Sequence, residues 1–135
     1  MESCLFCKIV SKEIASKILY EDDSAMAFLD VAPRAPGHTM VIPKRHAPTM
    51  LELSGIDLGQ LFTAVQKADN LLVRKLSPDG MTIGINQGKA SGQEIDHFHV
   101  HLIPRWQGDG GGAIQSVVFH PSEESLDEIQ KKLLI

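Results

Sequence analysis

The sequence predicts a single α+β domain built on an antiparallel sheet. The observations behind this prediction are about five short runs with strand character, one long segment with helical periodicity, and short connections between the strands. A chain of 135 residues and 14.8 kDa fits one domain, which can bury roughly two-thirds of its unfolded surface. No internal repeat or linker interrupts it, so residues 1–135 are taken as one domain.

The part before the long helix contains one short predicted helix and three predicted strands. Leu5 and Ile9 share one face of a helix expected at residues 4–13. The polar turn Asp22-Asp23-Ser24 separates two strand-like runs, which predicts a hairpin. Two prolines and a glycine at 32–37 form a loop before the third run. The three strands are expected at residues 17–21, 25–31 and 38–43.

A long amphipathic helix is expected at residues 57–76. Its apolar stripe consists of Leu58, Leu61, Phe62, Val65, Leu72 and Leu76. Asp57 followed by Gln60 resembles a capping box at its start, and the turn at 77–80 ends it. The remaining expected elements are strands at 81–86 and 98–103 (the second stopped by Pro104), a polar loop at 87–96, a mobile glycine-rich turn at 108–112 and a helix at 122–134.

Composition narrows the possible partners and compartment. Thirteen basic and seventeen acidic residues give a net charge of −4 without any Lys/Arg block. This disfavours nucleic acid as a partner but allows a small anionic ligand in a local pocket. No apolar run approaches the ~18 residues of a membrane span, and the N-terminus lacks the features of a signal peptide. We expect a cytoplasmic protein without a membrane partner, whose two cysteines are thiols or metal ligands.

Three histidines alternate with apolar residues near the end of the sheet region. In a strand, His97, His99 and His101 would share one face, with Phe98, Val100 and Leu102 on the other. Imidazole binds metals, and it acts as a nucleophile or base near neutral pH. The pattern alone therefore leaves a metal-binding or solvated face open beside catalysis. The preceding loop can cradle phosphate oxygens through Asn86, Gly88, Ser91, Gly92 and Gln93.

These residues resemble a known family. The segment His97–Ile103 resembles the signature of the histidine triad (HIT) family, and Pro36–His46 resembles its other recurrent stretch. Cys4–Val10, Phe28-Leu29-Asp30 and Gly84–Gly88 fit the same order, so the match runs from about residue 4 to residue 105. The branch it is most similar to is that of the purine nucleoside phosphoramidases, or histidine triad nucleotide-binding proteins. The resemblance implies a HIT-like fold, with five antiparallel strands and two main helices per subunit. It also implies a homodimer whose sheets join through residues 57–76 and 81–86.

The resemblance also implies the chemistry. His99 would be the nucleophile on the α-phosphorus of AMP or GMP amidates, with its second nitrogen held by a backbone carbonyl. His101 would contact the phosphate or the leaving group, and His38 would support His101. Phosphate oxygens would be held by Asn86, Gln93 and the backbone of Gly92. Water would then release the nucleotide from His99.

The same resemblance implies the nucleotide site. Asp30 would bind the ribose hydroxyls. The apolar slot for the base would consist of Phe6, Ile9, Ile14, Phe28 and Val31. Glu94 departs from the pattern, because many relatives carry a hydroxyl residue there. A carboxylate can relay a proton to the leaving group but repels phosphate. The segment 106–135 also differs from the short ending of eukaryotic relatives.

Cys4 and Cys7 form a Cys-x-x-Cys pair, which needs two further ligands for a closed tetrahedral site. By resemblance to zinc-bearing members, these ligands would be His46 and His97, and the zinc would be structural. A bend near Asp96 would have to aim His97 toward the cysteines.

Three alternatives stay open. One is a dinucleoside polyphosphate hydrolase with the same triad. Another is a nucleotide-binding scaffold dimer whose catalysis is incidental. The last is a zinc-binding structural protein without catalysis, which would not need His38, Asn86 and the Gly92-Gln93 pair.

Overall fold

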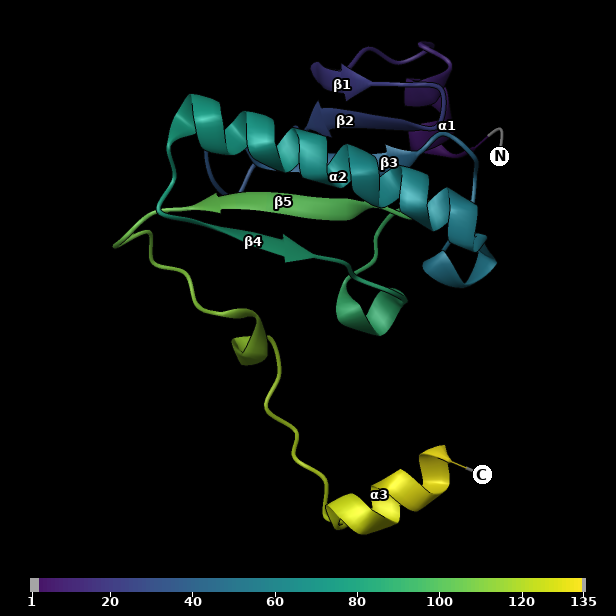
Figure 1. Ribbon diagram of the computed structural model, residues 1–135, viewed down its shortest axis with the longest axis vertical. Coiled ribbons are helices and arrows are strands. Elements are labelled where there is room, and N and C mark those ends of the chain that lie inside the picture. The colour runs from purple at the N-terminus through teal and green to yellow at the C-terminus, as the bar shows by residue number, and fades with distance from the viewer. Residues whose placement is uncertain (1–2, 135) are drawn as a thin grey trace.

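Five strands form one antiparallel sheet in the order β1-β2-β3-β5-β4 in this computed structural model, which describes residues 3–134 (Figure 1). The strands are β1 (Ile18–Glu21), β2 (Ala25–Leu29), β3 (Thr39–Pro43), β4 (Gly80–Gly84) and β5 (Val100–Arg105). The expected hairpin of β1 and β2 is present, with Asp22 accepting hydrogen bonds from the backbone of Ser24 and Ala25. The predicted antiparallel α+β architecture is confirmed.

Helix α2 (Gly55–Leu76) lies across one face of the sheet and contacts four of the strands (Figure 1). Its N-cap is Ser54, which exchanges hydrogen bonds with Asp57, so the expected pairing of Asp57 with Gln60 is wrong and the helix begins earlier. The residues buried on its inner face are Leu61, Ala64, Val65, Ala68 and Leu72. Phe62 and Leu76 lie at the rim of this stripe, 41% and 40% exposed.

Helix α1 (Leu5–Val10) packs on the opposite face of the sheet. Alternate residues of β2 and β3 separate into two cores, as the two-residue period of a strand requires. Ala25, Ala27 and Val41 pack with α2, together with Val100 and Leu102. The second core contains Phe6, Ile9, Met26, Phe28, Met40 and Ile42. Because Val100 and Leu102 face α2, His99 and His101 face α1.

Strand β5 begins and ends two residues later than expected. Residues 95–97 form a bend, and the Phe98 amide donates to the carbonyl of Ala47 rather than to a strand. His97 therefore lies in the bend before the strand, where its ring meets Phe6 of α1 at 5.9 Å. At the other end Pro104 does not stop β5, because it lies beyond the last pair with β3 and opposes Met81 of the edge strand β4. Proline is tolerated at such positions.

The chain beyond β5 leaves the sheet and runs away from it (Figure 1). Between Gln107 and Leu134 no residue is buried; this segment, residues 107–134, is called the tail below. It contains two helical segments, a 3₁₀ turn at Ile114–Ser116 and helix α3 (Leu126–Leu133). Helix α3 is shorter than the expected 122–134, because Ser125 caps its N-terminus through a capping box with Glu128. No helix within residues 3–134 is long and apolar enough to cross a bilayer.

Candidate active site and metal centre

His99 is buried immediately before β5, on the face of the sheet that α1 covers. Its Nδ1 donates to the carbonyl oxygen of His97 over 2.7 Å. A carbonyl can only accept, so Nδ1 carries the proton and Nε2 keeps its lone pair. His99 is thus held in the tautomer that makes Nε2 a nucleophile or a base.

A chain of hydrogen bonds fixes the neighbouring histidines in the same way. The Arg34 backbone amide donates to Nδ1 of His38 over 3.1 Å, so the His38 proton is on Nε2. Nε2 lies 2.9 Å from Nδ1 of His101, which therefore accepts. His101 in turn carries its proton on Nε2, a donor next to His99, whose ring centroid is 5.0 Å away.

Burial keeps this pair of histidines neutral at pH 7. Desolvation lowers the pKa of His101 to about 4, helped by the nearby His99 and His38. Desolvation also lowers the pKa of His38, against the opposing effect of Asp30. Neutral rings are what the hydrogen-bond chain requires, because a protonated His101 has no lone pair on Nδ1 to accept from His38.

Asp30, His38 and His101 place three donor atoms within 4.8 Å of one another, as a metal site would. The carboxylate Oδ2 of Asp30 is 3.5 Å from Nε2 of His38. However, the Arg34 amide already occupies the lone pair on Nδ1 of His38. A metal on Nε2 would force the proton onto Nδ1, directly against that amide. The cluster is therefore better suited to hold and pass a proton than to bind a metal.

An apolar floor lies under His99. The Phe6 ring meets the His99 ring edge-on at 5.2 Å and the Phe28 ring at 5.6 Å. Ile9 belongs to the same cluster. Three of the five expected base-slot residues are thus brought together, whereas Ile14 is 38% exposed and Val31 is 95% exposed.

The loop between β4 and β5 places the expected phosphate ligands at different depths. Asn86 lies against Gly92, which has a φ of +105° that other residues rarely adopt. Gln93 is buried, and its side chain is already used: it accepts from the Gly88 amide and donates to the carbonyls of Pro48 and Ile95. In this structure Gln93 shapes the loop. Glu94, beside it, is exposed.

The second cluster brings together four residues from three segments: Cys4, Cys7, His46 and His97. Cys7 Sγ is 3.3 Å from Nδ1 of His46, and Cys4 Sγ is 3.5 Å from Nδ1 of His97. The other nitrogen of His97 donates to the carbonyl of Pro43 over 2.7 Å, which leaves Nδ1 free to bind. The bend at residues 95–97 produces this orientation, as the sequence predicted.

The donor set of this cluster fits zinc. Two thiolates and two neutral imidazoles make a closed tetrahedral site without an open position, and burial keeps His97 neutral by lowering its pKa to about 4. Burial and the neighbouring Cys4 raise the pKa of the Cys7 thiol to about 11. A thiolate at this position therefore calls for a cation beside it. The cluster is compatible with a structural zinc ion.

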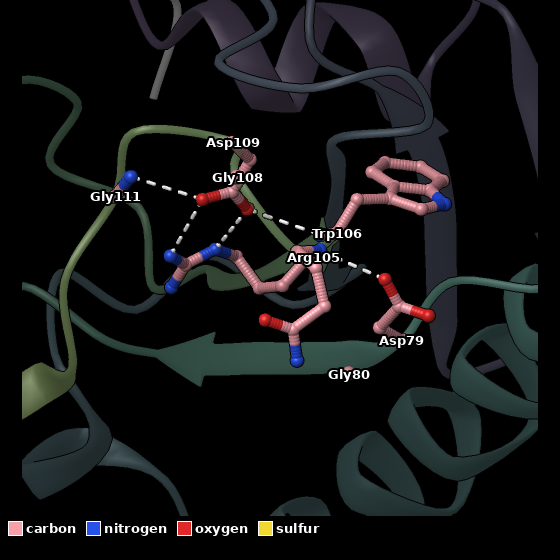
Figure 2. A pocket seen from close by; sticks show the side chains of 8 residues that line it. Asp79, Gly80, Arg105, Trp106, Gly108, Asp109 and Gly111 are labelled. Atoms are coloured by element: carbon pink, nitrogen blue, oxygen red, sulfur yellow. Dashed lines mark hydrogen bonds and ion pairs between the residues drawn. The ribbon is translucent and has the colours of Figure 1, made fainter.

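A shallow pocket of about 270 Å³ lies elsewhere, at the end of β5 (Figure 2). Asp109 accepts from Nε and Nη2 of Arg105 and from the backbone amides of Trp106 and Gly111. Arg105 Nη1 donates further to Thr82 and to the carbonyl of Gly112. The charges that line this pocket already have partners within the chain. The hydrogen bonds between Arg105, Asp109 and the backbone, called the clasp around Asp109 below, fix the turn at residues 108–112. The glycines of this turn had predicted that it is mobile.

The sequence predicted that a backbone carbonyl holds the second nitrogen of His99, and the His97 carbonyl does so, but two other backbone contacts of the site were not foreseen. The Arg34 amide sets the His38 tautomer, and the Pro43 carbonyl sets that of His97. The sequence does not identify such contacts, because every residue has the same backbone carbonyl and every residue except proline has the same amide. The only usable signal was the loop at 32–37, which has to turn back onto β3.

Comparisons with known proteins agree with this geometry. The model of the HIT domain family matches residues 11–108. An uncharacterised HIT-like protein of Methanocaldococcus jannaschii is 40% identical over 134 residues, covering 96% of this chain and 98% of its own. An adenosine 5′-monophosphoramidase of Schizosaccharomyces pombe is 39% identical, covering 76% and 74%. An adenylylsulfatase of Arabidopsis thaliana is 37% identical, covering 87% and 59%.

Solved structures support the same relationship. A HIT family protein from Bacillus anthracis superposes with a TM-score of 0.85 at 34% identity, covering 98% of this chain and 93% of its own. A zinc-bound histidine triad family protein from Mycobacterium smegmatis superposes with a TM-score of 0.75 at 32% identity, covering 91% and 85%.

Proposed function

This chain belongs to the HIT family and is a hydrolase, and from that premise we propose that it cleaves the phosphorus–nitrogen bond of purine nucleoside phosphoramidates. The substrate class is an AMP or GMP amidate. The observation that carries the proposal is the set of fixed tautomers, in which a lone pair on His99 Nε2 stands beside a proton on His101 Nε2. The similarity to an AMP phosphoramidase supports the same substrate class.

The reaction takes two steps at His99. Nε2 attacks the α-phosphorus, the new N–P bond forms and the bond to the leaving amine breaks. The positive charge that develops on the His99 ring is stabilised by the hydrogen bond from Nδ1 to the His97 carbonyl. The leaving amine takes up a proton relayed by Glu94, and Nε2–H of His101 stabilises the charge on the phosphate oxygens. Water then attacks the phosphorus, gives up a proton that restores the relay, and releases the nucleotide and free His99.

The rest of the site binds the nucleotide. The base lies on the apolar floor of Phe6, Ile9 and Phe28, and Asp30 accepts from the ribose hydroxyls. Asn86 and the Gly92 backbone hold phosphate oxygens. Glu94 is our candidate for the proton relay to the leaving amine. The adenylylsulfatase among the relatives indicates that leaving groups vary within the family.

We further propose that Cys4, Cys7, His46 and His97 hold a structural zinc ion. Its chemistry there is to bind two thiolates and two imidazoles, which ties α1 to the segments that carry the histidines. The zinc-bound relative supports this assignment. Two free cysteines used in this way suit a reducing compartment, so we assign the protein to the cytoplasm.

A homodimer completes the proposal. Strand β4 is an edge of the sheet, and open edges are normally covered. The two elements that the resemblance places at the dimer junction also carry half-exposed apolar residues, Phe62 and Val73 on α2 and Ile83 on β4. A second copy joined at β4 would pair the edge and cover these side chains.

Hydrolysis of a fluorogenic AMP phosphoramidate tests the proposed function. We expect turnover in the wild type and a loss of about a thousandfold or more in His99→Ala, because removing a nucleophile leaves only binding and electrostatic effects. His120→Ala, which changes an exposed histidine, is the matched control and keeps full activity. A wild type that binds AMP but does not turn over the amidate contradicts the proposal. Cleavage of dinucleoside polyphosphates in its place would favour the other hydrolase class.

A further inference from the structure

Phe6 lies between the two cysteines of α1 and touches both histidine clusters. Its ring meets the rings of His97 and His99 edge-on at 5.9 and 5.2 Å. Its side chain is 3% exposed. One aromatic ring is therefore packed against a ligand of the metal centre and against the nucleophile.

His97 makes a second link between the clusters. Its side chain faces the cysteines through Nδ1, and its main-chain carbonyl accepts from His99 Nδ1. The peptide that orients the nucleophile is thus part of the residue that binds the metal. The amide of the next residue, Phe98, is tied to Ala47, which follows the ligand His46.

Helix α1 depends on these contacts for its position. It has six residues, and helices below about 12 residues are marginal in water without tertiary support. Cys4 is its N-cap, with Sγ accepting from the Cys7 amide. Apart from the two sulfur atoms, the helix is held to the sheet mainly by Phe6 and Ile9. Without a metal on the two sulfurs, these two apolar side chains are the main contacts left to hold α1 on the sheet.

We propose that Phe6 and His97 are positioning residues that couple metal occupancy to the orientation of His99. This inference rests on the proposed function for its consequence in catalysis, but not for its structural content. With the metal in place, α1 presses Phe6 against His99 while the His97 carbonyl holds Nδ1. Metal loss frees α1, so the His99 ring gains freedom and the base floor opens. Nucleotide binding and transfer to His99 both weaken.

The test compares wild type and Phe6→Ala, each with metal and after chelation. The first readout is the nitrogen NMR spectrum of the His99 ring, which reports its tautomer without any turnover. The second is AMP affinity, and the third is the single-turnover rate of transfer to His99. In the wild type we expect chelation to move His99 away from the pure Nδ1–H form. We also expect it to slow transfer about tenfold or more, since small misplacements of reacting groups are costly.

Phe6→Ala should keep its metal, as element analysis will show, yet resemble the chelated wild type in all three readouts. Chelating this variant should add less than about a twofold change, because effects that share one route are not additive. Phe119→Ala, which removes a 93% exposed ring from the tail, is the control and should respond to chelation as the wild type does. Phe6→Leu should fall between Phe6→Ala and the wild type.

A His99 spectrum that chelation does not change would overturn the proposal. It would also be overturned if chelation slowed transfer in Phe6→Ala by the same factor as in the wild type. If the metal-free protein unfolds, the metal-loaded forms of the wild type, Phe6→Leu and Phe6→Ala still decide. The proposal requires the His99 ring to gain freedom in that order. A wild type without amidase activity would contradict the proposed function but not the coupling, because the His99 spectrum and the AMP affinity can still be measured.

Discussion

The sheet with its two flanking helices (residues 3–105) and the tail (residues 107–134) use similar residues in opposite ways. Both contain leucines at helical spacing, at least one histidine and a capping box. In the first region, contacts from several elements converge on each functional side chain: His99 is fixed by the His97 carbonyl, and His38 by the Arg34 amide. In the tail no side chain is buried. Local sequence preferences therefore make a helix in both regions, but only packing from distant elements makes a site.

The largest expected difference comes from the same substitution made in each region. Leu102 of β5 is fully buried in the core, whereas Leu126 of α3 is 88% exposed. We expect Leu102→Ala to lower the free energy of unfolding by about 2–5 kcal/mol, through lost burial and the cavity left behind. Leu126→Ala should change it by less than about 0.5 kcal/mol. Urea unfolding measures both, and equal losses would show that the tail is packed in solution.

How much of the fold the sequence predicts also differs between the sheet region and the tail. The period-two alternation of Phe98, Val100 and Leu102 correctly predicted which side chains enter the core, because a half-buried strand has to alternate. Where β5 begins was mispredicted, because a backbone bond from Phe98 to Ala47 decides it. The helix expected at residues 122–134 is present in shorter form as α3, with Leu126, Ile129 and Leu133 at helical spacing, but periodicity does not reveal whether anything packs against it.

For the site, too, the sequence predicts which residues come together but not what each side chain contacts. Motif order places His38, His99 and His101 in one cluster and the two cysteines with His46 and His97 in another, and the structure brings both sets together. The sequence did not reveal that Gln93 is occupied within its own loop. It also placed Val31 in the base slot, where the structure leaves that side chain open to solvent. Both depend on how a loop closes, which composition does not encode.

A pH titration of stability tests the comparison next. The pKa of His101 falls from 6.5 to about 4 on folding, so between these values the unfolded chain binds more protons than the native protein. Stability should be level above pH 7 and fall as the pH drops from about 6.5 toward 4. A shift of this size corresponds to a loss on the order of 3 kcal/mol.

Urea unfolding of chelated protein measures this loss without a contribution from metal release. His101→Asn should reduce the slope by the share of His101, while His97 and His38, whose pKa values burial also lowers, keep the rest. Deleting the tail should leave the slope as it is, since His101 and its hydrogen-bond partner His38 lie in the sheet region. A slope that is unchanged in His101→Asn would assign the whole acid sensitivity to other groups.

The smallest effect is expected from removing the part of the tail that follows Gly112. A chain ending at Gly112 keeps the carbonyl that accepts from Arg105 and the whole clasp around Asp109. It loses no buried side chain, and the eight residues of α3 are too few to form a stable helix alone. We expect the free energy of unfolding to change by less than about 1 kcal/mol, with turnover of the AMP amidate kept. A larger loss that grows with protein concentration would mean that the exposed Ile114, Val117 and Phe119 pack on a second copy. In that case the contrast between the two regions belongs to the single chain, and the tail acquires its core only in the assembly.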